Sequence, residues 1–293
     1  MKYAYFPGCS LHSTAKEYDI SSRAVASALG IELVEIPDWV CCGATPAHLT
    51  LHLLSLALPV KNLLAAKKLG NYEVATCCAA CFSRLKIANK FMESDPEHRE
   101  KVEEIVGAKY SGEVKVRHFL DILVNVFGLK NISERVTKKI SGLKVACYYG
   151  CLLTRPPEVM QLDDPEEPHL IDDLMKVIGV EPVEWPYKTE CCGASFSLTK
   201  TDIVLKLSAD ILQMAADAGA QAIVVACPLC QSNLDLRQAM INKKYKKNFN
   251  MPILYFTQLV GLALVIEARK LGLEKHIVNP IPLLKEKEIL SKV

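Results

Sequence analysis

The sequence has no apolar run long enough to cross a membrane. A transmembrane helix needs about 18 consecutive apolar residues. The richest stretch, 49–66, is interrupted by His52, Pro59 and Lys61, and a second stretch, 256–268, spans only 13 residues. Both stretches are typical of buried helices, so we expect no membrane-embedded part.

The sequence also has no excess of either charge. Lysine and arginine total 35 against 33 acidic residues, which gives a formal net charge of +2. Proteins whose main partner is a nucleic acid carry a strongly basic surface. The basic run in 243–247 is typical of a solvated helix face. We therefore expect no nucleic-acid partner.

Signals for export and for nucleotide cofactors are missing as well. The opening MKYAYFPGC has no basic start followed by a long apolar core, so we expect a cytoplasmic protein. The motifs G-x-G-x-x-G, G-K-[ST] and H-E-x-x-H are absent. These are the signatures of flavin, nicotinamide, nucleotide triphosphate and zinc-protease chemistry. We therefore expect this chain to bind no flavin or nucleotide.

Cysteine, in contrast, is abundant, with 12 among 293 residues. In a reducing compartment, cysteines of a chain this long are expected to be metal ligands or redox groups rather than disulfides. Ten of them form two sets with the same order, namely a single Cys, a CCG triplet and a CxxC. The single Cys precedes the pair by 31 and 39 residues, and the CxxC follows the pair after 35 and 34 residues. The chain therefore contains an internal repeat of two halves.

Two cysteines stand outside this repeat. Cys77 aligns with Ala226, and Cys147 aligns with Tyr5. Each of these cysteines therefore has no cysteine at the equivalent position in the other half. We expect both to be small buried hydrophobic residues rather than ligands.

Each half predicts the same alternation of strands and helices. The expected strands are 3–7, 32–36, 73–76, 144–149, 182–185 and 222–226, and the expected helices include 15–29, 49–69, 170–178 and 202–218. Each CxxC opens a further helix, with Pro228 in its first turn. The alternation predicts an α/β fold with mostly parallel strands, made of two tandem pseudo-twofold-related domains, 1–140 and 141–293. A linker is expected near 129–143 and a tail after 278.

Five cysteines per half leave several kinds of site to weigh. A disulfide between adjacent cysteines is strained. Structural zinc takes four ligands, as do the ordinary [2Fe-2S] and [4Fe-4S] clusters, so a fifth repeated cysteine would be surplus. Zinc in one half stays open. Gly43 and Gly193 are expected to supply the tight backbone that aims both thiols of a pair into one pocket.

The repeated pattern resembles the CCG-domain (cysteine-rich) iron–sulfur proteins, and most of all the B subunits of soluble heterodisulfide reductases from methanogens. The resemblance covers nearly the whole chain. It implies two non-cubane [4Fe-4S] clusters with five thiolate ligands each. The first cluster would be held by Cys9, Cys41, Cys42, Cys78 and Cys81, and the second by Cys151, Cys191, Cys192, Cys227 and Cys230.

The same resemblance implies an activity and partners. The activity is reduction of the coenzyme M–coenzyme B mixed disulfide to two thiols in methanogenesis, with the disulfide between the two clusters. The partners are a flavin-bearing A subunit and a ferredoxin-like C subunit, with a hydrogenase or formate dehydrogenase complex beyond them. Alternatives are other CCG-domain oxidoreductase subunits, of the glycolate, lactate, glycerol-3-phosphate or thiol:fumarate type, and a cluster-bearing electron relay without a substrate of its own.

Contacts to the substrate are not marked by any motif. The implied substrate carries a sulfonate and a phosphate, so cationic groups should line its cavity. Three cations near motif cysteines are candidates: Arg84, Arg155 and Lys200. Three histidines are candidate proton donors, although a lone histidine is more often structural: His12, His48 and His118. The longer gap in the second half predicts a proline-rich loop at 154–169, which shapes substrate entry or is a plain surface insertion.

Overall fold

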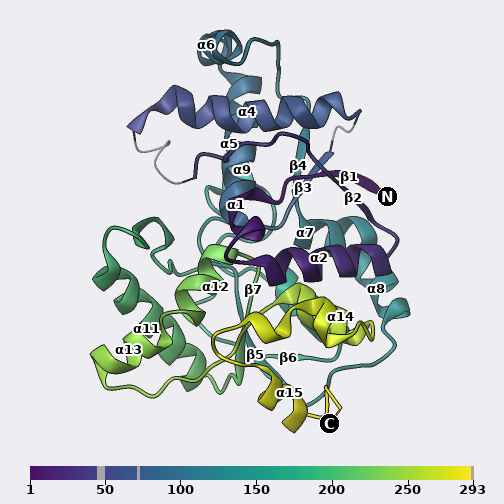
Figure 1. Cartoon of the computed structure of the whole chain (residues 1–293), viewed down its shortest axis with the longest axis vertical. Coiled ribbons are helices and arrows are strands. Elements are labelled where there is room, and N and C mark those ends of the chain that lie inside the picture. The colour runs from purple at the N-terminus through teal and green to yellow at the C-terminus, as the bar shows by residue number, and fades with distance from the viewer. Residues whose placement is uncertain (45–49, 71–72, 292–293) are drawn as a thin grey trace.

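The structure is a computed structural model that describes residues 1–44, 50–70 and 73–291. Two four-stranded parallel sheets organise the chain (Figure 1). The first has the order β2-β1-β3-β4, with β1 Lys2–Tyr5, β2 Glu32–Glu35, β3 Glu73–Thr76 and β4 Lys115–His118. The second has the order β6-β5-β7-β8, with β5 Lys144–Tyr148, β6 Glu181–Pro182, β7 Ala222–Val225 and β8 Ile253–Tyr255. The identical order and the parallel pairing confirm the α/β class and the repeat.

The strands nearest the centre of each sheet are the most apolar. All four residues of β7 are buried, and so are the last three of β3. Strands covered on both faces by helices are expected to be continuous apolar runs. Parallel strands also need a crossover connection, and in both halves this connection contains a helix.

Helices connect successive strands in both halves, and those of the first half are given first. They are α1 Gly8–His12, α2 Lys16–Ala28, α4 His52–Lys68, α5 Ala79–Ser94, α6 Pro96–Val106, α7 Phe119–Asp121, the π-helix η1 Ile122–Gly128 and α8 Leu129–Arg135. The second half contains α9 Pro157–Met160, α10 Leu170–Val177, α11 Thr201–Asp217, α12 Pro228–Asp235, α13 Gln238–Tyr245, α14 Phe256–Ala263 and α15 Ile281–Glu286, with short 3₁₀ turns η2 Ala194–Phe196, η3 Ala268–Leu271 and η4 Leu273–Lys275. Among the described residues, no helix combines the length and apolar character of a bilayer span.

The fold departs from the sequence expectations in three places. The fourth strands, β4 and β8, were not expected, because β4 carries alternating charged residues and β8 is only three residues long. The expected linker 129–143 begins with helix α8, which buries Ile132. Strand β6 is shorter than expected, and the N–H groups of Glu181 and Val183, on either side of Pro182, bond it to the carbonyls of Leu143 and Val145. The start of the expected helix 49–69 lies partly outside the described residues, and α4 begins at His52.

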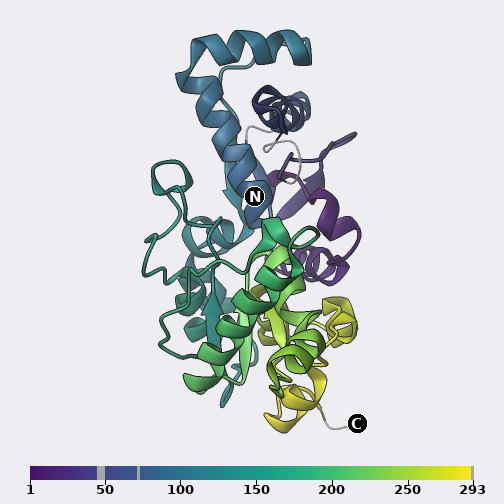
Figure 2. The ribbon, with the colours of Figure 1, turned by 90° about the vertical axis from the view of Figure 1, so that its left-hand side faces the viewer.

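The two halves pack directly on one another through α2 and α14. These helices lie side by side in Figures 1 and 2. The rings of Tyr18 and Tyr255 stack with their centroids 3.9 Å apart, and the Ser21 and Thr257 hydroxyls are hydrogen-bonded at 2.7 Å. All of these groups are buried, so the interface is part of the core rather than a solvated contact.

Candidate metal centres

The motif cysteines follow the carboxyl ends of neighbouring strands. In the first half, Cys9 comes four residues after the end of β1, and Cys78 comes two residues after the end of β3. Strands β1 and β3 are adjacent and parallel, so their carboxyl ends open on the same edge of the sheet. The fold therefore gathers these thiols where loops of α/β proteins bind ligands.

The thiols of the first half contact one another in a chain. The pKa of Cys42 is held well below its usual value because its sulfur interacts with the thiols of Cys41 and Cys81. Cys81 in turn interacts with Cys78, and Cys9 lies within electrostatic reach of Cys41. Cys9 and Cys41 are exposed, whereas the other three are buried. All five predicted ligands of the first half are brought together.

The second half repeats this arrangement. The Sγ atoms of Cys192 and Cys230 lie 3.7 Å apart. Contact with Cys151 lowers the pKa of Cys191 to about 6. Contact with Cys230 holds the pKa of Cys227 well below its usual value. The same contacts raise the pKa of the partner thiols, such as Cys81 and Cys230, so each set shares protons that metal binding would displace.

Glycines make room for these sulfurs. A Cβ atom at Gly8 would lie 2.9 Å from Cys81 Sγ, and one at Gly150 would lie 3.0 Å from Cys230 Sγ. Both glycines have a positive φ, +71° and +65°, which L side chains rarely adopt. The matched pair indicates a cradle at the same place in both halves.

The glycine of each CCG triplet behaves as the sequence predicts. Gly43 and Gly193 have φ of 77° and 78°. The Gly43 N–H donates to Cys41 Sγ at 3.4 Å, and the Gly193 N–H donates to Cys191 Sγ at 3.3 Å. The left-handed turn therefore folds the backbone amide back onto the first thiol of the pair.

The two sets of thiols adjoin each other. Cys78 and Cys227, which open α5 and α12, interact through their sulfurs. Beneath them, His118 Nε2 lies 2.9 Å from the Cys77 carbonyl and 3.1 Å from the Ala226 carbonyl. Leu120 N–H donates to His118 Nδ1, so Nε2 carries the proton. Burial lowers the pKa of His118 to about 4, and the neutral ring therefore ties the two CxxC approaches together.

The donor set has the chemistry that iron–sulfur clusters use. Across the three described stretches of chain, no three Cys, His, Asp or Glu side chains are arranged around a single metal ion. Five thiols per half, most of them buried, are instead linked through pairwise contacts. Thiolates in an apolar setting are the ligands that iron–sulfur clusters use.

The two cysteines outside the repeat are buried, as predicted. Cys77 and Cys147 are both 0% exposed. Burial raises the pKa of Cys77 to about 12 and that of Cys147 well above its usual value. Cys77 donates to the Ser22 hydroxyl at 3.3 Å. Both are therefore neutral thiols that pack in the core.

A pocket of about 630 Å³ opens beside both CCG turns. Its lining includes Thr14 and Ala44 from the first half and Ala194, Leu229, Leu236 and Met240 from the second. Most of this lining is apolar, and Arg237 is its one cation among the described residues. Sequence reasoning missed this pocket, because its walls are alanines, leucines and small hydroxyl residues that carry no motif.

Only one of the three candidate cations has its charged group beside motif cysteines. The Arg84 guanidinium is half-buried and acts electrostatically on Cys42. Arg155 instead donates to Glu166 at 2.7 Å and to Thr189 at 3.3 Å. Lys200 is exposed at the start of α11. None of the three belongs to the lining of the 630 Å³ pocket.

The three candidate histidines have different surroundings. His118 is the neutral bridge described above. His12 lies 3.0 Å from the Glu35 carboxylate and packs edge-on against Trp39. His48 lies outside the described residues. A role as proton donor stays a prediction for His12 and His48.

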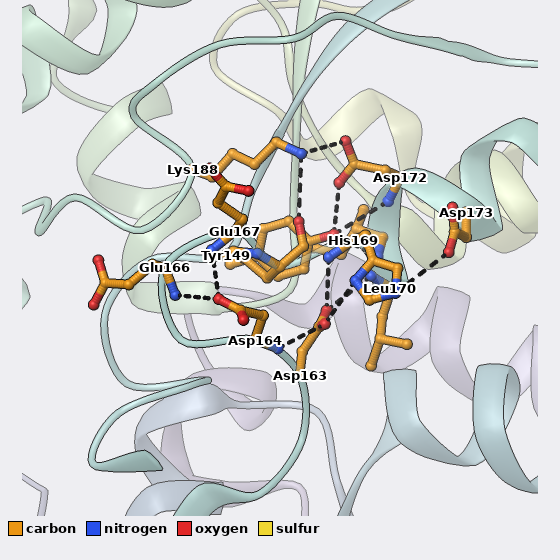
Figure 3. Close-up of polar contacts among 12 residues, drawn as sticks. Tyr149, Asp163, Asp164, Glu166, Glu167, His169, Leu170, Asp172, Asp173 and Lys188 are labelled. Atoms are coloured by element: carbon orange, nitrogen blue, oxygen red, sulfur yellow. Dashed lines mark hydrogen bonds and ion pairs between the residues drawn. The ribbon is translucent and has the colours of Figure 1, made fainter.

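The loop at 154–169 is held by a polar network (Figure 3). The buried Asp163 carboxylate accepts the backbone N–H groups of His169 and Leu170, both at 2.8 Å, at the start of α10. Just after β5, the Tyr149 hydroxyl bonds Asp172 at 2.6 Å, and Asp172 pairs with Lys188 at 2.9 Å (Figure 3). These contacts hold the loop and the start of α10 against the end of β5.

The same loop reaches the first half. Lys86 on α5 donates to the Met160 carbonyl at 2.5 Å, at the end of α9. Phe82 of α5 and Leu162 of the loop line one polar pocket of about 400 Å³. The insertion therefore joins the two halves instead of projecting as a free surface loop.

Comparison with known proteins identifies the repeat. The model of the CCG, cysteine-rich domain family matches residues 3–86 and 145–235. The chain belongs to the CCG family. It is 32% identical to the "8-methylmenaquinol:fumarate reductase membrane anchor subunit" of Wolinella succinogenes, over 95% of this chain and 97% of that protein. It is also 29% identical to the B subunit of the ferredoxin:CoB-CoM heterodisulfide reductase of Methanosarcina mazei, over 100% of this chain and 97% of that protein.

The CCG repeat also has a relative among solved structures. A hypothetical protein from Helicobacter pylori superposes with a TM-score of 0.75 at 15% identity, over 95% of this chain. The chain spans about half of that structure, 52%. At this identity the likeness shows the shared fold.

Proposed function

We propose that this chain is the catalytic subunit of a CCG-domain oxidoreductase and carries two non-cubane [4Fe-4S] clusters, one in each of the domains 1–140 and 141–293. The ligands would be Cys9, Cys41, Cys42, Cys78 and Cys81 in the first domain and Cys151, Cys191, Cys192, Cys227 and Cys230 in the second. The contact between Cys78 and Cys227 is the observation that carries the proposal. It supports two adjoining cluster sites, on a chain whose family relatives are named as subunits of reductases.

The substrate we propose is the coenzyme M–coenzyme B disulfide. Opening it to two thiols consumes two electrons and two protons. An iron–sulfur cluster supplies one electron at a time, so two adjoining clusters match the electron count. The 630 Å³ pocket would bind the disulfide beside both CCG turns, and its apolar wall would exclude water. Electrons would come from a flavin-bearing A subunit and a ferredoxin-like C subunit. Relatives that are named as B subunits of heterodisulfide reductases support a multisubunit complex.

A second candidate is a subunit that exchanges electrons with a quinol. The apolar lining of the pocket favours it, because Arg237 is the one cation that the described part of the chain contributes to a cavity that would have to hold a sulfonate and a phosphate. Leu198, which belongs to the lining, is 93% exposed. The Wolinella relative is named for an 8-methylmenaquinol reaction, and this chain is 32% identical to it.

One experiment separates the two candidates. The chain is purified without oxygen, its iron is measured, and it is assayed with an artificial one-electron donor against the mixed disulfide and against a short-chain menaquinone. About eight iron per chain with disulfide reduction supports the first candidate. About eight iron with menaquinone reduction alone supports the second, and about four iron with one zinc contradicts both.

Matched cysteine variants test the ligand assignment. Cys81→Ala should lose about half of the iron, because it removes a thiolate from the first set alone. Cys77→Ala should keep all of it, since alanine occupies the equivalent position, Ala226, in the other half. Loss of iron from the Cys77 variant would contradict the assignment.

A further inference from the structure

The two halves differ in charge at one equivalent position next to their thiols. Arg84 follows Cys81 by three residues on α5, and Asn233 follows Cys230 by three residues on α12. Residues three apart lie on the same face of a helix. The repeat therefore places a cation beside the first set of thiols where the second set has a neutral amide.

Arg84 is held in place beside Cys42. Its Nη2 donates to the Ser55 carbonyl at 3.2 Å, and its Nε is buried with no hydrogen-bond partner among the residues the structure describes. Burial lowers the pKa of Arg84, and attraction to the Cys42 sulfur opposes that shift. A guanidinium stays protonated in proteins, so this charge is fixed.

Asn233 makes the corresponding contact without a charge. Its Nδ2 donates to the Cys192 carbonyl at 3.1 Å and lies 3.5 Å from Cys192 Sγ. Its Oδ1 accepts from the Ser197 hydroxyl at 2.9 Å and from Arg237 Nε at 3.3 Å. The Arg237 cation is thus separated from the thiols by the amide and is also bonded to the Ser197 carbonyl.

A negative charge beside the second set of thiols adds to the difference between the two halves. Glu190 directly precedes the second cysteine pair and is an electrostatic neighbour of Cys191. The first half has Val40 at that position. Glu190 is exposed, so solvent screens its charge more than that of Arg84.

We propose that Arg84 makes the two centres electrically unequal, so that the centre in the first half is reduced at a higher potential than the centre in the second. A nearby positive charge stabilises the state with one more electron, and a cluster's potential follows the charges and hydrogen bonds around it. The first electron to arrive therefore rests in the first half. This inference rests on the two clusters proposed above, but not on which substrate they serve.

The test is a redox titration of the anaerobic, cluster-loaded chain, followed by electron paramagnetic resonance. Cys81→Ser and Cys230→Ser, each expected to retain one cluster, assign the signals to the two halves. Arg84→Gln should lower the potential of the first-half signal and leave the other unchanged. Asn233→Arg should raise the second-half potential. Arg84→Lys, which keeps the charge, should stay close to the wild type.

A matched control removes a cation elsewhere. Arg99 on α6 also donates to a single backbone carbonyl, that of Met92 at 3.3 Å, and Arg99→Gln should move neither potential. Should Arg84→Gln fail to retain iron, Arg84→Lys and Asn233→Arg still decide the question. The inference is overturned if the wild type with about eight iron titrates at one potential, or if Asn233→Arg shifts nothing. A chain without two clusters would overturn the proposed function instead.

Discussion

Cys78 and Cys227 lie 149 positions apart in the sequence, yet their thiols interact across the boundary between the two sheets. Each is the N-cap of the helix that leaves its sheet, α5 or α12. The N-terminus of a helix favours negative charge. Two such termini therefore point their first cysteines at one shared region, and a change at one thiol should be felt in both halves.

Cys78→Ala should accordingly disturb both centres. We expect loss of about half of the iron and a changed resonance spectrum of the remaining cluster, because one of its neighbours is gone. Cys41→Ala serves as the control, since the thiols that act on Cys41 are Cys42 and Cys9 of its own half. In the Cys41→Ala variant, the resonance spectrum of the remaining cluster should match that of the second-half cluster in the wild type. Identical spectra for the two variants would contradict the contact.

Gly8 should be intolerant of any side chain. A Cβ there would lie 2.9 Å from Cys81 Sγ, so Gly8→Ala should displace that thiol and lower the iron content. Gly30→Ala is the matched control, because Gly30 has a similar φ of +74° and open space around its Cβ position. Both variants should lose about 1–2 kcal/mol of stability from the left-handed backbone. Only Gly8→Ala should lose iron, and equal iron in both would show that the cradle is not needed.

Removal of the metal should expose a defined subset of cysteines. Cys9, Cys41 and Cys191 are exposed, whereas Cys77 and Cys147 are fully buried. After chelation at pH 7, iodoacetamide should modify Cys191 first, because its pKa of about 6 makes it a thiolate. Peptide mass spectrometry at successive times measures the order in which the cysteines are modified. Labelling of Cys77 or Cys147 before denaturant is added would contradict their place in the core.

Much of this arrangement was visible in the sequence because it depends on spacing. The CCG and CxxC groups repeat in register, and the glycines after each pair predicted the positive φ that Gly43 and Gly193 adopt. The expected strand 73–76 matches β3 residue for residue. These features are local, since strand ends and turn residues are set by a few neighbouring side chains.

What the sequence did not reveal depends on how the halves meet. The bridge from His118 to the carbonyls of Cys77 and Ala226 joins residues 41 and 108 positions apart. No pattern marks it, because a buried histidine and two carbonyls are common in any fold. The environment of Arg84 was equally hidden, since its distance from Cys42 is set by the packing of α5 against the CCG turn and not by their 42-residue separation.

Asp163 should anchor the insertion of the second half. Its carboxylate, 1% exposed, accepts two backbone N–H groups at the start of α10. Asp163→Ala should cost about 1–2 kcal/mol in urea unfolding, as the loss of a helix cap does. Asp164→Ala is the control from the same loop, because Asp164 also accepts two N–H groups but is exposed. It should cost less, and a larger loss from Asp164 would contradict the role given to Asp163.

Glu17 should make stability fall as pH rises. It is buried on α2 near Asp235, and burial raises the pKa of its carboxyl from 4.5 to about 7. Between these values the folded chain keeps a proton that the unfolded chain releases, so this stabilisation is complete below pH 4.5 and is lost as pH rises through 7. Glu17→Gln cannot ionise and should be more stable than the wild type at pH 8, on the order of 1 kcal/mol, and equal to it at pH 4.5. Urea unfolding at both pH values measures the difference. Glu97→Gln is the control: the pKa of this exposed carboxyl is lowered in the fold, so its replacement should reduce stability at pH 8 instead of raising it. A gain from Glu17→Gln that is the same at both pH values would mean that the carboxyl ionises normally in the fold.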